Sequence, residues 1–162
     1  SAGGLALRPR ARGFLGAIVR IERRLQETWQ KEVSGRSDQQ LKAELDTFAK
    51  TVEHHLAHTD APLRLGAEVE GRLVGYIIGE VRLWEFGVGE ETGWINVLGV
   101  DPDYQQRNIG RQLGQRLLDH MREKGVRRVR TLVDSYSGEL ISFFRSLGFQ
   151  IIPMMPMDKP LD

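Results

Sequence analysis

An apolar run that passes through a polar turn into an amphipathic helix is the feature that most restricts the fold of this chain. The run is "TGWINVLGV", residues 92–100, and the turn begins "DPD". A helix is expected from about Asn108 to Lys124, and four apolar side chains recur along it: Ile109, Leu113, Leu117 and Met121. Their four-residue spacing predicts one buried helix face. We therefore expect this helix to lie against a sheet that contains the preceding strand.

The segments before this unit predict more strands and two helices. Residues 5–10 form a short strand whose Pro9 places it at an edge or a strand end. Helical spacing of apolar residues predicts helices over residues 13–32 and, after a cap at Ser37 or Asp38, to about residue 58. Strands over residues 64–71 and 72–84 follow, with Glu70-Gly71 as their hairpin turn.

The segments after the central helix predict alternating strands and helices, namely a strand over 126–134, a helix over 137–147 and a last strand over 149–154. Consecutive central strands favour antiparallel pairing, and the later strand–helix–strand units favour parallel crossovers. The expected class is α/β with a mixed, mostly antiparallel sheet and helices on both faces. We expect one domain over residues 1–162, with residues 1–4 an expression remnant or disordered.

Composition narrows the function classes. The 162 residues are 40% apolar and 28% charged, as in ordinary soluble globular proteins. A net charge of +1 argues against a nucleic-acid binder with a basic excess. The absence of cysteine excludes disulfides, thiolate metal sites and a cysteine nucleophile. No apolar run approaches the roughly 20 residues of a membrane span, so we expect a cytoplasmic protein without a membrane partner.

The turn before the central helix has the chemistry of an anion site. The free backbone N–H groups at a helix start, together with the helix dipole, favour a negative ligand. Arg107 and Arg111 add charge, Gly110 permits close approach, and Asn108 tolerates a positive φ. The alternative is a solvated helix start with scattered arginines, and the local residues leave both open.

Three segments together resemble the GNAT acetyltransferase superfamily. The family motif Gln/Arg-x-x-Gly-x-Gly/Ala is matched by residues 105–110, "QQRNIG". The preceding strand and turn are matched by "VLGVDPDY", residues 97–104, and the Asn-x-x-Ala helix that ends in Tyr-x-x-x-Gly-Phe by "SGELISFFRSLGF", residues 137–149. The resemblance covers the element order over residues 5–153.

The resemblance implies acetyl-CoA as cosubstrate. It implies that the diphosphate lies on the backbone N–H groups of residues 107–111, that the sheet is splayed at residues 97–100 to pair with the pantetheine, and that the Leu98 N–H faces the thioester carbonyl. The cofactor-binding residues expected on this basis are Leu98, Gly99, Val100, Gln105, Gln106, Arg107, Asn108, Ile109, Gly110, Arg111, Ser137 and Phe144.

Three positions depart from the family pattern. Asn108 replaces the first motif glycine, Ser137 replaces the Asn that helps to hold the pantetheine, and Phe144 replaces the Tyr that often acts as general acid. A CoA thiolate is a tolerable leaving group, since a thiol pKa is about 8.5. Tyr136 or Ser135 is the substitute acid, and we select Tyr136.

An amine acceptor also needs a base. Glu80 lies in mid-strand on the face that alternation assigns to Tyr76, Ile78 and Arg82. The alternative is that Glu80 pairs with Arg82 or lies at a solvated edge. Asn96 stands on the strand where some family members carry His or Glu, and it is expected to position a water. The catalytic prediction is therefore Glu80, Asn96 and Tyr136.

Two polar groups carry open alternatives. His54 and His58 have metal-like spacing, with His55 between them, but no third ligand is evident. We interpret the three as the polar end of a helix and expect no metal. The acidic group Glu80, Glu85, Glu90 and Glu91 either attracts a cationic amine or belongs to a plain loop.

The function expected is transfer of the acetyl group from acetyl-CoA to a primary amine by direct attack in a ternary complex. The acceptor is a small-molecule amine or a protein or peptide amine, and a homodimer is left open. The alternative from another class is a non-catalytic module of GNAT fold that binds acyl-CoA. A weaker one is a nucleic-acid binder that uses residues 127–130, although none is expected as a partner.

Overall fold

The computed structural model describes residues 4–9, 14–33, 35–83 and 90–161. It contains two compact units, one up to Leu132 and one from Val133 to the end of the chain. The first unit holds the sheet and three of the long helices, and the second holds one helix and the C-terminal segment. Each unit is described by itself.

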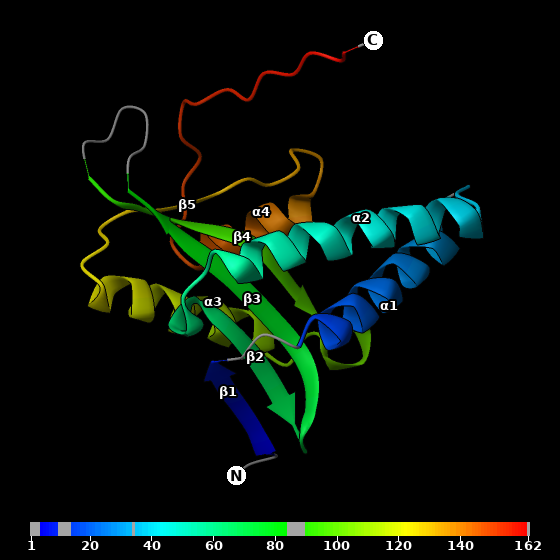
Figure 1. The fold of residues 1–162 in the computed structure, drawn as a ribbon, viewed down its shortest axis with the longest axis horizontal. Helices are drawn as coiled ribbons and strands as arrows, with labels where there is room; N and C mark the ends of the chain where they lie inside the picture. Colours follow the sequence, from blue (N-terminus) through cyan, green and yellow to red (C-terminus); the bar gives the residue numbers. More distant parts are fainter. Residues whose placement is uncertain (1–3, 10–13, 34, 84–89, 162) are drawn as a thin grey trace. The chain divides into compact units, whose positions relative to one another are not determined.

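A five-stranded sheet forms the first unit, in the order β1-β2-β3-β4-β5 (Figure 1). Its first four strands pair antiparallel, and β5 joins β4 in parallel. The strands are β1 (Leu5–Pro9), β2 (Arg64–Val69), β3 (Arg72–Arg82), β4 (Thr92–Val100) and β5 (Val129–Thr131). The expected mixed, mostly antiparallel sheet is confirmed.

Helices cover both faces of this sheet, as expected. On one face α1 (Leu15–Val33) and α2 (Asp38–Ala57) share a core with Tyr76 and Ile78 of β3. On the other face lies α3 (Ile109–Glu123), so close that a Cβ on Gly79 would be 2.8 Å from Met121 and 3.1 Å from Leu117. From Gly75 to Gly79, alternation along β3 thus sends odd and even residues to opposite faces of the sheet.

Local signals in the sequence locate most boundaries. Ser37 begins α2 with a capping box that it shares with Gln40. Glu70 (φ 51°) and Gly71 (φ 78°) form the predicted hairpin turn. Two short 3₁₀ turns, η2 (Ala61–Leu63) and η3 (Pro102–Tyr104), connect the elements around the sheet. Trp29 of α1 is 47% exposed, and Arg36 lies over its ring.

A β-bulge in β4 splays the sheet. Ile78 lies opposite Val97, but the next residue of β3, Gly79, lies opposite Ile95, so Asn96 is the extra residue. The ladder between β4 and β5 contains three pairs and ends at Ile95 and Thr131. Within the described residues, the two strands therefore part immediately after the bulge, which confirms the expected splay.

Two strand predictions are wrong. Residues 149–154, expected as a last strand, have neither helix nor strand structure. A strand needs a partner for its backbone groups, Pro153 has no N–H to offer, and the Phe149 N–H donates to the Phe144 carbonyl instead. The strand expected over residues 126–134 is only three residues long, because the bulged β4 supplies partners for only three.

None of the helices in the described ranges combines the length and apolar character of a bilayer-spanning helix. The cytoplasmic location stays a prediction.

Candidate active site

The C-terminal half of β4 presents backbone groups at an open edge. The Asp101 N–H donates to the Val74 carbonyl of β3 at 2.7 Å. Because antiparallel pairing alternates, the N–H groups of Leu98 and Val100 point away from β3. In the described residues the ladder with β5 has already ended at this level. An extended ligand with amide groups can therefore pair with this edge as an added strand would.

Beyond this edge, the start of α3 has the free backbone N–H groups that the predicted anion site requires. Its first intrahelical bond runs from the Gln112 N–H to the Asn108 carbonyl at 3.1 Å, and Asn108 supplies no side-chain cap. Asn108 has φ 66° and Gln106 has φ 62°. Each left-handed residue other than glycine costs about 1–2 kcal/mol. The positive φ expected for Asn108 is confirmed, and such strain is typical of a turn that positions its N–H groups for a ligand.

Side chains add less to this turn than the sequence indicates. The Gln105 side-chain amide donates to the Val100 carbonyl at 3.2 Å, so it fixes the turn to β4. Arg107 is exposed and its guanidinium lies 4.9 Å from the ring centre of Tyr104. Arg111 is half-buried on the first turn of α3. The donors at this turn are therefore mostly backbone N–H groups, with the Arg107 charge beside them.

A buried ion pair supports the turn from α1. Asp101 is fully buried, and one of its oxygens accepts from Arg24 and from the Asp103 N–H. Arg24 also donates to the Asp103 carboxylate at 2.8 Å. The hydrogen bonds that Arg24 donates to the carboxylates, to Asp103 first and then to Asp101, raise the pKa of Arg24. Sequence reasoning missed Arg24, which lies 77 residues from Asp101.

A polar cluster lies at the bulge, on the sheet face that α1 and α2 cover. His55 of α2 lies with its Nδ1 at 3.2 Å from the Asn96 side-chain nitrogen. On β3, Glu80 accepts from Arg82 at 2.9 Å, and the Arg82 guanidinium lies 4.2 Å from the Trp94 ring centre. Of the predicted catalytic residues, Glu80 and Asn96 thus belong to one cluster. The ion pair between Glu80 and Arg82, which the sequence left open as the alternative, is also observed.

Burial lowers the pKa of His55, so its imidazole is neutral near pH 7. The negative charge of Glu80 opposes this shift, whereas His54, Arg82 and His58 support it. Sequence reasoning assigned His55 to a polar helix end. A usable signal was its position three residues after Val52, a fully buried residue of the apolar face of α2.

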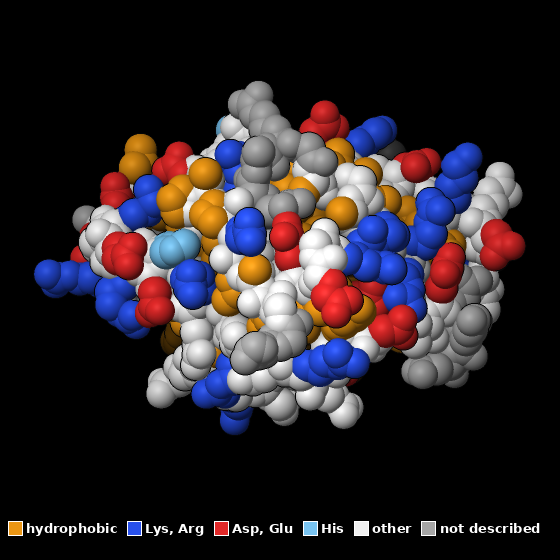
Figure 2. Space-filling view, turned by 90° about the horizontal axis from the view of Figure 1, so that it is seen from below, with side chains coloured by type: hydrophobic (Ala, Val, Ile, Leu, Met, Phe, Trp, Pro, Cys, Tyr) orange, Lys and Arg blue, Asp and Glu red, His pale blue; other side chains and the backbone are white. Residues whose placement is uncertain are grey.

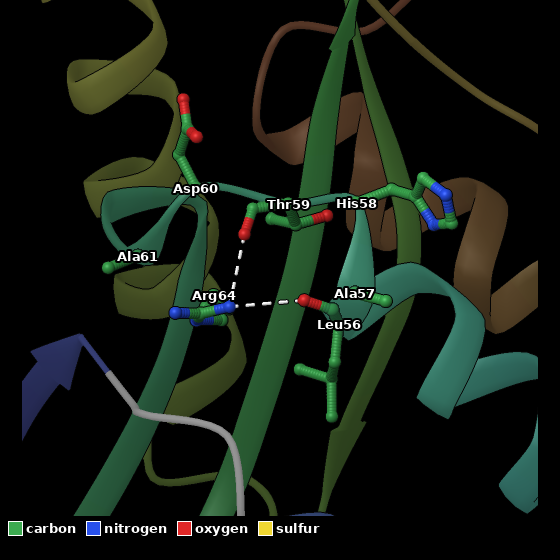
Figure 3. A pocket seen from close by; sticks show the side chains of 7 residues that line it. All are labelled: Leu56, Ala57, His58, Thr59, Asp60, Ala61 and Arg64. Atoms are coloured by element: carbon green, nitrogen blue, oxygen red, sulfur yellow. Dashed lines mark hydrogen bonds between the residues drawn. The ribbon is translucent and has the colours of Figure 1, made fainter.

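Two depressions lie at the C-terminal end of α2. One, of about 390 Å³, is shown in Figure 3, where Arg64 reaches the backbone carbonyls of Leu56 and Thr59 at 3.1 Å each. These bonds fix the turn after α2, so this depression has a structural explanation. The other, of about 330 Å³, includes three carboxylates: Asp60, Glu80 and Glu91.

Lys124 pairs with Asp60 at 3.0 Å within this second depression, and Glu80 pairs with Arg82 at 2.9 Å. Three carboxylates against these two cations leave one net negative charge among the described residues. Glu85, from the predicted acidic group, lies outside the described residues. Elsewhere the charge is mixed, since acidic and basic side chains are interspersed on the face that Figure 2 shows. Over the described ranges, no group of three or more His, Asp or Glu residues is arranged to hold a metal ion.

The second unit contains three of the predicted site residues. Ser137 caps α4 (Gly138–Ser146) by accepting from the Leu140 N–H at 3.3 Å. Phe144 is buried, with its ring 5.2 Å from that of Phe149. Tyr136 is 96% exposed. Their expected roles stay predictions.

Comparison with known proteins agrees with this geometry. The family model described as "Acetyltransferase (GNAT) family" matches residues 20–149. The chain belongs to the GNAT acetyltransferase family. Enzymes of this family use acetyl-CoA as acetyl donor. A similar curated protein is the mycothiol acetyltransferase of Thermobifida fusca, 41% identical over 63 residues, which are 39% of this chain and 20% of that protein.

Solved GNAT structures share the fold over nearly the whole chain. The PaiA N-acetyltransferase of Thermoplasma acidophilum, in complex with coenzyme A, aligns with a TM-score of 0.74 over 94% of this chain and 93% of that one, at 17% identity. The aminoglycoside N-acetyltransferase AAC(6')-Iy, in complex with CoA, aligns with a TM-score of 0.69 over 99% and 97%, at 15% identity. At these identities the likeness concerns the fold alone.

Proposed function

We propose that this chain is an N-acetyltransferase that moves the acetyl group of acetyl-CoA to a primary amine. The observation that carries the proposal is the open edge of β4, which continues from the bulge at Asn96 to the N-terminus of α3. An edge that pairs with amides and a helix start that binds an anion are the two elements that a pantetheine diphosphate needs. The family membership supports the same reading.

The residues that we propose to hold acetyl-CoA come from both ends of this edge. The outward backbone groups of Leu98 and Val100, on either side of Gly99, pair with the pantetheine. The diphosphate binds at the strained turn, on the backbone of residues 105–111 with the Arg107 charge beside it. Acetyl-CoA supplies a thioester with a good leaving group. Ser137 and Phe144 are assigned to the pantetheine side from their motif positions.

For acyl transfer, the protein must stabilise the developing oxyanion, position the amine and supply a proton to the leaving group. The Leu98 N–H stabilises the negative charge that develops on the thioester oxygen. Asn96 and Glu80 hold the amine or a water beside the bulge. Tyr136 is the proposed proton donor to the departing thiolate, and a thiol pKa of about 8.5 makes that assistance modest. The amine attacks directly in a ternary complex.

A small cationic amine is the acceptor that we favour. Carboxylates in excess line the depression that includes Glu80, which is also part of the cluster at the bulge. Excess negative charge in a cleft raises the local concentration of a cation. The names of the related proteins, mycothiol acetyltransferase and aminoglycoside N-acetyltransferase, also indicate small-molecule acceptors.

The proposal also covers the extent of the domain and the range of acceptors and partners. We treat residues 1–162 as one GNAT-like acyltransferase domain, which the family match across both units supports. The chain covers only 20% of the mycothiol acetyltransferase, so the activity of that whole protein is not transferred. A protein acceptor and a homodimer stay predictions.

Steady-state release of CoA in the presence of a panel of amines tests the proposed function. The panel should contain aminosugars, a polyamine, a lysine peptide and a matched N-acetylated compound as the non-acceptor control. Release with at least one amine, together with the acetylated amine in mass spectra, is the expected result. Binding of acetyl-CoA without release on any amine would favour the non-catalytic acyl-CoA-binding module instead.

A further inference from the structure

His55 is placed by α2 directly over the reacting end of the proposed site. Its Nδ1 lies 3.2 Å from the side-chain nitrogen of Asn96, the extra residue of the bulge. Asn96 precedes Leu98, the proposed oxyanion donor, by two residues. Because an amide nitrogen only donates, Nδ1 is the acceptor, and the proton of the neutral ring is on Nε2. The basic lone pair of His55 therefore points at the bulge.

We propose that His55 is the general base that deprotonates the acceptor amine; this inference rests on the proposed acetyl transfer. An alkylammonium with a pKa near 10 must lose a proton before its nitrogen can attack. The His55 Nδ1 exchanges its hydrogen bond with Asn96 for one with the ammonium, directly or through one water, accepts that proton and becomes an imidazolium. The nitrogen then bonds to the thioester carbon, and the C–S bond breaks. Tyr136 gives its proton to the thiolate, the nitrogen loses its second proton to solvent, and Tyr136 is reprotonated from solvent. The imidazolium returns its proton to solvent.

The charges around His55 suit this cycle. Glu80 and Arg82 face it from β3, His54 and His58 lie on its own helix, and Asn96 of β4 is neutral. Burial keeps the resting imidazole neutral by lowering its pKa, and Glu80 stabilises the imidazolium that forms. Both properties are those of a base that works near pH 7.

The neighbouring groups are less suited to the role. Glu80 accepts a hydrogen bond from Arg82 at 2.9 Å, so this carboxylate already has a cationic partner on its own strand. His54 is exposed, and its ring lies 4.4 Å from that of His58. Glu80 is therefore assigned to orienting the ammonium and His55 to removing its proton. The role that we propose for Glu80 thereby changes from general base to a group that orients the ammonium.

The test compares His55→Gln with His54→Gln, the same change one residue away on an exposed side chain. At pH 7 we expect His55→Gln to lower kcat about 100-fold or more, the usual contribution of a general base. His54→Gln should stay within about twofold of the wild type, because no step is assigned to it. Acetyl-CoA affinity by calorimetry and the thermal unfolding midpoint should be unchanged in both, which separates lost chemistry from lost folding.

The pH profile gives a readout that a structural role would not move. Wild-type kcat should fall as pH drops through the lowered pKa of His55, since only the neutral ring accepts a proton. The deficit of His55→Gln should shrink toward pH 10, where the amine deprotonates without help. Added imidazole should restore part of the activity of His55→Ala.

Each outcome bears on a different claim. An active wild type with the same kcat and pH profile in His55→Gln would overturn this inference and leave the proposed function standing. A deficit that does not change with pH and is not relieved by imidazole would also overturn it. A wild type that binds acetyl-CoA but turns over no amine would overturn the proposed function, and the inference with it.

Discussion

The two ends of β4 take part in the site in different ways. After the bulge, the strand and the turn that follows present backbone groups, at Leu98, Val100 and the start of α3. Before and at the bulge, side chains from three elements meet, and the closest contact joins His55 of α2 to Asn96 of β4. The comparison teaches that one end depends on local geometry and the other on packing between segments distant in sequence.

The largest effect is expected where packing supports the backbone end. Arg24→Met leaves the buried carboxylate of Asp101 without its cation, which costs about 3–5 kcal/mol in comparable buried pairs. Urea unfolding measures this loss, and acetyl-CoA affinity should fall with it because the turn is released. Asp103→Asn is the matched control. The Asp103 carboxylate that accepts from Arg24 is exposed, so the expected cost in unfolding free energy is below about 1 kcal/mol. Equal costs in the two variants would mean that the buried pair does not support the turn.

The dependence of the unfolding free energy on pH above 9 tests the packing of Tyr76 against β4. Burial, and then the charge of Glu22, raise the pKa of Tyr76 well above 10. The raised folded-state pKa means that stability is complete below pH 10 and is lost above it, by about 1.4 kcal/mol per pH unit for one proton. Tyr76→Phe should remove this slope. Unfolding free energies at pH 9, 10 and 11 compare the two, and parallel curves would show that Tyr76 ionises freely in the fold.

The turn itself should respond to backbone freedom rather than to the side chain. Asn108→Gly relieves the positive φ and should retain acetyl-CoA affinity, whereas Asn108→Ala should cost about 1 kcal/mol of stability relative to the glycine variant. Thermal unfolding and calorimetry measure both quantities. If the glycine variant loses affinity, the Asn108 amide contacts the ligand and the backbone account of this end is wrong.

The smallest effect is expected at Gln105. Its side chain donates to the Val100 carbonyl on the surface, so Gln105→Ala should lower stability by about 1 kcal/mol or less and change the Kd for acetyl-CoA less than about fivefold. A larger loss of affinity would mean that Gln105 leaves Val100 and binds the diphosphate, as the sequence motif implies.

The sequence predicts the cofactor end of β4 better than the end at which side chains meet. Strand, turn and helix are continuous in the chain, so apolar spacing and the motif at residues 105–110 locate the cofactor end, including the positive φ of Asn108. Glu80 could be proposed because alternation fixes its face, and Asn96 because the family resemblance places His or Glu on the same strand in some members. His55 and Arg24 could not, since their partners lie 41 and 77 residues away and only packing brings them together. The last strand was mispredicted because apolar composition does not supply a pairing partner.

Calorimetric titration with acetyl-CoA is the most direct test of the central claim that the cofactor end, namely β4 after the bulge with the start of α3, binds the cosubstrate without help from the side chains that meet at the bulge. Wild type and His55→Gln should bind with micromolar Kd, about −8 kcal/mol, and Arg107→Glu/Gly110→Trp should not bind. That result would establish the turn as a diphosphate site independent of the side-chain end. No binding by the wild type, or equal loss in His55→Gln, would contradict the account.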